Sequence, residues 1–89
     1  MTNQQQQDLC VLGKAIRALR EQHDLSVREL AAGAGVAETC IADLEDGRLD
    51  PDFELLLTLA ERMDLRPSAF FLRAEELRRH AKARKGHQE

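Results

Sequence analysis

"SVRELAAGAGVAETCIADLEDG", residues 26–47, contains two short helical segments separated by a glycine turn. Ser26 and Glu29 form a capping box pattern, in which each side chain bonds the backbone N–H of the other residue, so we expect a helix to start at Ser26. Gly35 can adopt the positive φ that a sharp turn requires. A second helix is predicted from Ala37 to about Asp46. Its predicted inward residues are Cys40, Ile41 and Leu44. The pattern is that of a helix-turn-helix.

Three further segments place apolar residues at helical spacing. The first is predicted from about Asp8 to Gln22, where Gly13 would allow another helix to approach closely. Another follows Pro51, with Asp52 as its N-cap. Its predicted inward residues are Phe53, Leu56, Leu57, Ala60 and Met63. The last begins at Pro67, a favoured first position of a helix. The sequence therefore predicts an all-α fold.

The chain has 89 residues, which is enough for one domain. We expect a disordered polar tail over 1–7, a helix-turn-helix domain over 8–81 and a basic C-terminal tail over 82–89. The polar start "MTNQQQQDL" is unlike a signal peptide, and no apolar run approaches the ~20 residues of a membrane span. A cytoplasmic protein with no membrane association is expected.

Cys10 and Cys40 lie too far apart in the sequence for a zinc-binding pair and are interpreted as small buried apolar residues. The three histidines have no nucleophile or carboxylate partner at catalytic or metal-binding spacing. They are His23, His80 and His87. The protein is therefore expected not to be an enzyme and to have no cofactor or metal.

Charge is distributed unevenly along the chain. Residues 1–65 contain thirteen Asp or Glu against six Lys or Arg, a net charge of −7, whereas residues 66–89 contain seven bases against three acids, a net charge of +4. The second predicted helix of the motif is itself acidic. Attraction to DNA comes from Lys and Arg that neutralise phosphates, so an acidic body predicts weak non-specific attraction.

From Leu9 to about Phe71 the sequence resembles the DNA-binding domains of phage repressors and Cro proteins, often called the XRE family. The resemblance lies in "SVRELAAGAGV" (26–36), Ile41 with "LEDG" (44–47), Pro51, and "LLLTLAERMDLRPSAFF" (55–71). It implies a five-helix, lambda-repressor-like helix-turn-helix domain, here with an extended basic C-terminal helix. It also implies a sequence-specific transcriptional regulator whose partner is double-stranded operator DNA.

The resemblance further assigns roles to individual residues. The helix at about 37–46 would enter the major groove as the recognition helix. Its base-facing residues would be Glu38, Thr39 and Asp43. The residues expected at phosphates are Ser26, Arg28 and Arg48. Arg20 and Glu45 match a buried structural ion pair of the family.

Two positions depart from the usual family pattern. Val27 stands where Gln is common and cannot donate to a phosphate. Ala37 stands where Ser or Thr usually caps the recognition helix, which lowers the stability of that helix by roughly 1 kcal/mol. The alternative function is a degenerate helix-turn-helix that acts as a protein–protein interaction module, antitoxin-like or regulator-binding, with weak or no DNA binding.

The last helix carries more apolar surface than one contact face can bury. Its main apolar stripe consists of Phe70, Ala74, Leu77 and Ala81. Phe71 and Leu72 lie off this stripe, and exposed apolar surface of this kind often marks an interface. We therefore expect a homodimer through residues 68–81. The alternative is a monomer whose core this helix wraps more completely.

Overall fold

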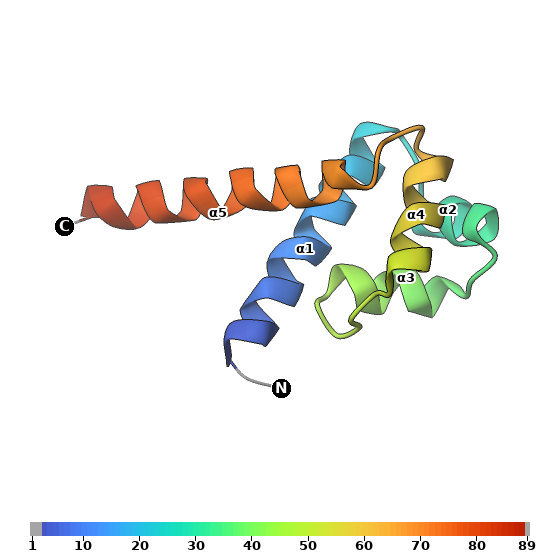
Figure 1. The fold of residues 1–89 in the computed structure, drawn as a ribbon, viewed down its shortest axis with the longest axis horizontal. Helices are drawn as coiled ribbons and strands as arrows, with labels where there is room; N and C mark the ends of the chain where they lie inside the picture. The colour runs from blue at the N-terminus through green and yellow to red at the C-terminus, as the bar shows by residue number, and fades with distance from the viewer. Residues whose placement is uncertain (1–2, 89) are drawn as a thin grey trace.

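The computed structural model describes the backbone of residues 3–88 and the side chains of residues 3–80, and within these ranges the protein consists of five α-helices and no strand (Figure 1). The helices are α1 (Asn3–Gln22), α2 (Val27–Ala34), α3 (Glu38–Glu45), α4 (Phe53–Arg62) and α5 (Ser68–Gln88). The all-α prediction is confirmed. α1 contacts both α3 and α5, and α2 contacts α3 and α4. The C-terminal part of α5 extends away from the other four helices.

Local signals in the sequence fix the start and the end of α2. The backbone N–H of Glu29 donates to Ser26 Oγ at 3.0 Å, and the N–H of Ser26 donates to Glu29 Oε1 at 2.9 Å, so the predicted capping box is present. Gly35 ends the helix with φ 72°, in the left-handed region. The turn between α2 and α3 is therefore built as the sequence predicted.

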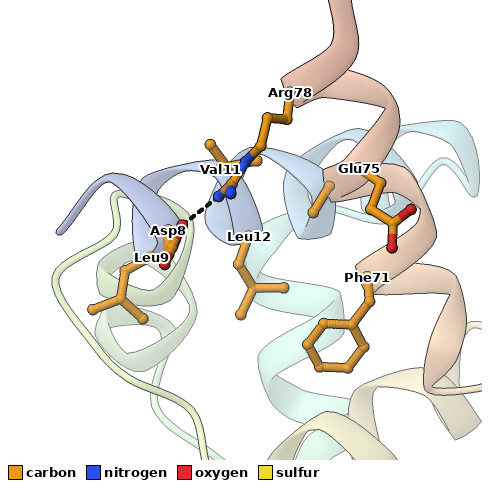
Figure 2. A pocket seen from close by; sticks show the side chains of 8 residues that line it. Asp8, Leu9, Val11, Leu12, Phe71, Glu75 and Arg78 are labelled. Carbon is orange, nitrogen blue, oxygen red and sulfur yellow. Dashed lines mark hydrogen bonds and ion pairs between the residues drawn. The ribbon is translucent and has the colours of Figure 1, made fainter. Parts of the chain in front are cut away.

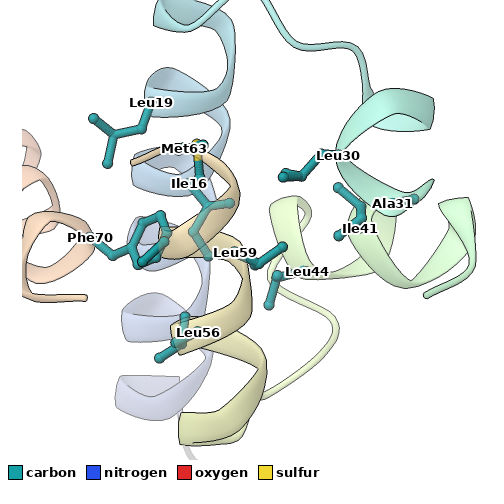
Figure 3. Close-up of a cluster of buried hydrophobic side chains, with 11 residues drawn as sticks. Ile16, Leu19, Leu30, Ala31, Ile41, Leu44, Leu56, Leu59, Met63 and Phe70 are labelled. Carbon is teal, nitrogen blue, oxygen red and sulfur yellow. The ribbon is translucent and has the colours of Figure 1, made fainter. Parts of the chain in front are cut away.

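One hydrophobic core joins all five helices (Figure 3). Its largest fully buried side chains are Phe70, Ile16, Leu30, Ile41, Leu44 and Leu59. Ile41 and Leu44 place one side of α3 in this core, as predicted. Phe70 brings the first turn of α5 against α1 and α4. This core supports α3 from one side and leaves its other side at the surface.

Three predictions of burial are wrong. Phe53 is 67% exposed, because it is the first residue of α4 and the inward face of that helix begins one turn later, at Leu56. Leu57 is only partly buried, since Leu56, Leu59 and Ala60 occupy the core side. Cys10 and Cys40 are free thiols and also only partly buried.

The ends of the chain differ from the sequence prediction. Residues 3–7, expected in a disordered tail, form the first turns of α1, because glutamine is a good helix former and Gln6 bonds to the loop at Gly47. At the other end, α5 continues through Gly86 to Gln88. The side chains of the predicted basic tail, 82–89, lie outside the described residues. No described helix combines the length and the hydropathy needed to span a membrane.

Candidate nucleic-acid interface

α3 presents one polar, solvent-exposed side. The three residues predicted to face bases, Glu38, Thr39 and Asp43, are all exposed. Ile41 is fully buried and Leu44 is 1% exposed on the opposite side. The structure therefore brings the predicted base-facing residues together on the free surface of a short helix.

Backbone contacts with α1 hold α3 in place. A Cβ atom added at Gly13 would lie 2.5 Å from the carbonyl oxygen of Glu45 and 2.6 Å from that of Leu44. Real Cβ atoms do not approach so closely, so only glycine allows this separation between α1 and the end of α3. The close helix approach predicted for Gly13 is confirmed.

The predicted ion pair between α1 and α3 is present and buried. Arg20 Nε donates to Glu45 Oε2 at 2.7 Å, and its second nitrogen donates to Oε1 at 3.1 Å. Arg20 also donates to the carbonyl of Leu25 at 2.7 Å. The hydrogen bond with Glu45 raises the pKa of Arg20 above its ordinary value, although burial opposes this. Glu45 is thus neutralised inside the protein and adds no free negative charge to the surface.

The residues predicted at phosphates lie outside α3, and all three are exposed. Arg28 is exposed on α2, and Arg48 is exposed in the loop that follows α3. The backbone N–H of Arg48 donates to the carbonyl of Asp43 at 2.8 Å, which fixes the start of this loop. Ser26 Oγ accepts the N–H of Glu29 and also bonds the Glu29 carboxyl group, so the Ser26 side chain is engaged in the capping box of α2.

The two departures from the family pattern have structural consequences. Val27 is partly buried and packs against the core, so this position contributes an apolar contact and no hydrogen bond. Ala37 occupies the N-cap of α3 with extended backbone angles, φ −72° and ψ 152°, and makes no side-chain cap bond. The stability of α3 therefore depends more on its packing against the core than on capping at its N-terminus.

Sequence reasoning missed the contact between the first turns of α1 and the loop after α3. Gln6 Nε2 donates to the carbonyl oxygen of Gly47 at 3.0 Å, and Gly47 is buried with φ 75°. A Cβ atom at Gly47 would lie 2.8 Å from Cys10 Sγ. The spacing of Gln6, Cys10 and Gly13 on one helical face was the signal that could have predicted this contact. Because these residues are polar or small, they do not form the hydrophobic pattern by which contact faces are recognised in a sequence.

Two short helices joined at a left-handed glycine, with the second exposed on one side and buried on the other, define a protein of the helix-turn-helix class. Comparison with known families agrees, because the helix-turn-helix family model matches residues 16–70. The chain therefore belongs to the helix-turn-helix family of XRE type, whose members are DNA-binding transcriptional regulators. The family predicted from the sequence is confirmed.

Solved structures with the same fold include two of the clp gene regulator ClgR from Corynebacterium glutamicum. One has a TM-score of 0.84 and 23% identity and covers 91% of this chain and 86% of ClgR. The other has a TM-score of 0.75 and 26% identity, with coverages of 78% and 88%. The restriction-modification controller protein C.AhdI from Aeromonas hydrophila has a TM-score of 0.69 and 28% identity, with coverages of 71% and 96%. No curated protein sequence matches the chain.

Proposed function

We propose that this protein regulates transcription by placing α3 in the major groove of a specific operator. The observation that carries the proposal is the division of α3 into a buried side and an exposed side, with Glu38, Thr39 and Asp43 on the exposed side. A helix held in this way can present side chains to base edges without losing its packing. The similar structures of a gene regulator and a controller protein support a regulatory role.

Acidic side chains on α3 are compatible with base recognition. The carboxylates of Glu38 and Asp43 can accept a hydrogen bond from the exocyclic amine of cytosine, and Thr39 can offer a methyl group to thymine or its hydroxyl to other bases. These contacts specify a sequence but do not attract a polyanion. We assign the attraction to Arg28, to Arg48 and to the basic residues of α5.

The proposal is tested by selecting bound sequences from a random pool of DNA duplexes at two salt concentrations. We expect an enriched motif whose affinity falls as salt rises, because phosphate contacts release counterions. A pool that shows no enrichment at either concentration would contradict DNA recognition. Co-purification of a protein partner in that case would favour the interaction module instead.

We also propose that the protein acts as a homodimer through α5. Phe71 is 47% exposed and Leu72 is 58% exposed, which is unusual for large apolar side chains on one helical turn. Beside Phe71, α1 and α5 enclose an open groove of about 360 Å³ (Figure 2). Its lining residues are Asp8, Leu9, Val11, Leu12, Phe71, Ala74, Glu75 and Arg78. A second copy that buried this surface would form a two-fold regulator with two recognition helices.

Sedimentation of the wild-type protein and of the Phe71→Ser/Leu72→Ser variant tests this assembly. We expect a dimer for the wild type at tens of micromolar and a shift toward monomer for the variant, because both substitutions remove apolar contact area. Phe53→Ser, at an exposed apolar position of α4 outside residues 68–81, is the control and should remain dimeric. A wild-type protein that stays monomeric throughout would contradict the proposal.

A further inference from the structure

The first three turns of α1 form a contact surface for the end of α3. Gln6, Cys10 and Gly13 are spaced by four and three positions, so they share one face of the helix. Gly13 lies against the carbonyls of Leu44 and Glu45, and Cys10 lies against the backbone of Gly47. Gln6 completes this face by donating to the Gly47 carbonyl oxygen.

One side of this contact surface precedes the residues that the family model matches. The family match begins at residue 16, whereas Gln6, Cys10 and Gly13 all precede it. The residues on the other side of the contact, Glu45 and Gly47, are within the match. The first turns of α1 therefore lie before the matched region and pack directly against the end of α3.

The contact holds the loop immediately before Arg48. On one side, the Gly47 carbonyl is held by Gln6; on the other, the Arg48 N–H is held by the Asp43 carbonyl at 2.8 Å. Gly47 also has a left-handed φ of 75° and a Cβ atom there would meet Cys10. The loop backbone is thus held at two consecutive residues, which restrains the backbone position from which the Arg48 side chain extends.

The same turns of α1 are attached to α5. Asp8, two positions after Gln6, forms an ion pair with Arg78 (Figure 2). Leu9 and Leu12 line the groove together with Phe71 of α5. The N-terminal turns are therefore held from the side opposite the loop, and Gln6 does not depend on a freely moving end of the chain.

We infer that Gln6 is a positioning residue for DNA binding: its hydrogen bond to Gly47 orients the loop so that Arg48 can reach a phosphate. The part that concerns Arg48 and phosphate rests on the proposed function. The part that concerns the order of the loop does not, and it is measured without DNA. The two parts can therefore fail separately.

The test compares Gln6→Met with Gln7→Met. Methionine keeps the length and the helix propensity of glutamine but cannot donate to a carbonyl, and neither substitution changes the net charge. Gln7 is exposed in the same helical turn, which makes its variant a matched control. The measurements are the thermal midpoint, amide hydrogen exchange at residues 47–49, and DNA affinity as a function of salt.

Loss of the bond should raise the exchange rates at residues 47–49 roughly 3- to 10-fold in Gln6→Met, the amount expected for one hydrogen bond that restrains a local opening. Gln7→Met should leave them unchanged. The salt dependence of DNA affinity should also fall by up to about one unit of slope in Gln6→Met, because one phosphate contact is weakened.

Equal exchange rates in Gln6→Met and Gln7→Met would overturn the inference, whatever happens to DNA affinity. Faster exchange in Gln6→Met with an unchanged salt slope would overturn the assignment of Arg48 to a phosphate and leave the loop contact standing. If the wild type binds no DNA at all, the proposed function fails, and the exchange rates still decide whether Gln6 orders the loop.

Discussion

The guanidinium of Arg20 and the carboxylate of Glu45 meet through two parallel hydrogen bonds, at 2.7 and 3.1 Å, between α1 and the last residue of α3. Their side chains are only 10% and 7% exposed. Bidentate Arg–carboxylate pairs combine charge with fixed geometry. The pair thus restrains how α3 is oriented on the body of the protein.

Arg20→Ala should lower the free energy of unfolding by about 3–5 kcal/mol, because it leaves the carboxylate of Glu45 buried without a partner. Arg17→Ala is the control, since Arg17 pairs with Glu21 at the surface, where the side chains are 61% and 57% exposed, and such pairs contribute roughly 0–1 kcal/mol. Urea unfolding measures both. Similar losses in the two variants would show that the buried pair has no special role.

Gly13→Ala and Gly33→Ala should differ in their effect on stability although both glycines are helical. At Gly13 the new Cβ would meet backbone carbonyls at 2.5 Å, so the helices must separate and we expect a loss of about 1–3 kcal/mol. At Gly33 it would meet the Nε of Arg62 at 2.4 Å, a flexible side chain that can move. There the helix propensity of alanine, roughly 1 kcal/mol better than glycine, should give an equal or higher stability. Thermal unfolding of both variants checks the contrast.

Ala37→Ser should stabilise the protein. Ala37 already has the extended backbone angles of an N-cap but makes no side-chain cap bond, so a serine hydroxyl could accept a free N–H of α3 and add about 1 kcal/mol. Ser26→Ala, which removes an existing cap on α2, should cause a loss of similar size. Urea unfolding of the two variants gives the comparison, and a destabilised Ala37→Ser would contradict it.

Glu29 should contribute stability that depends on pH. The hydrogen bond from the Ser26 backbone, together with that from its side chain, holds the pKa of Glu29 below its ordinary value of 4.5. A carboxyl group whose pKa is lowered in the folded state stabilises it above the ordinary pKa, and this contribution is lost as pH falls through the lowered value. Glu29→Gln does not titrate, so the stability of the wild type relative to Glu29→Gln should fall as pH drops from above 4.5 through the lowered pKa of Glu29. An unchanged difference, measured by urea unfolding, would refute the assignment.

Two substitutions should separate base recognition from phosphate binding. Glu38→Gln should change the base preferred at one position of the operator, because an acceptor is replaced by a group that can also donate. Arg48→Ala should weaken binding to all sequences and lower the salt slope by about one. Both are measured by competition binding against a set of single-base operator variants. An unchanged preference in Glu38→Gln would place that side chain away from the bases.

The sequence predicted those parts of the fold that depend on local rules. The cap at Ser26, the left-handed turn at Gly35 and the inward positions Ile41 and Leu44 each follow from a few neighbouring residues, and the structure contains all of them. The pair of Arg20 with Glu45 was predicted only from the family resemblance. The two residues are 25 positions apart, and no local rule links residues at that separation.

The remaining differences arise from contacts between distant segments. Phe53 has the spacing of a core residue, but the packing of α4 begins one turn later. The N-terminal glutamines have the composition of a disordered tail, but they are helical, and Gln6 among them bonds to Gly47, 41 positions away. Composition cannot reveal a hydrogen bond to a backbone carbonyl so far along the chain.

The side chains that would read bases have no part in holding the protein together. Glu38, Thr39 and Asp43 are exposed, while the helix that carries them is secured by residues on its other side and at its end. Mutations can therefore accumulate at these three positions without unfolding the chain. A new target sequence could evolve, or be selected in the laboratory, through a few substitutions on an unchanged scaffold.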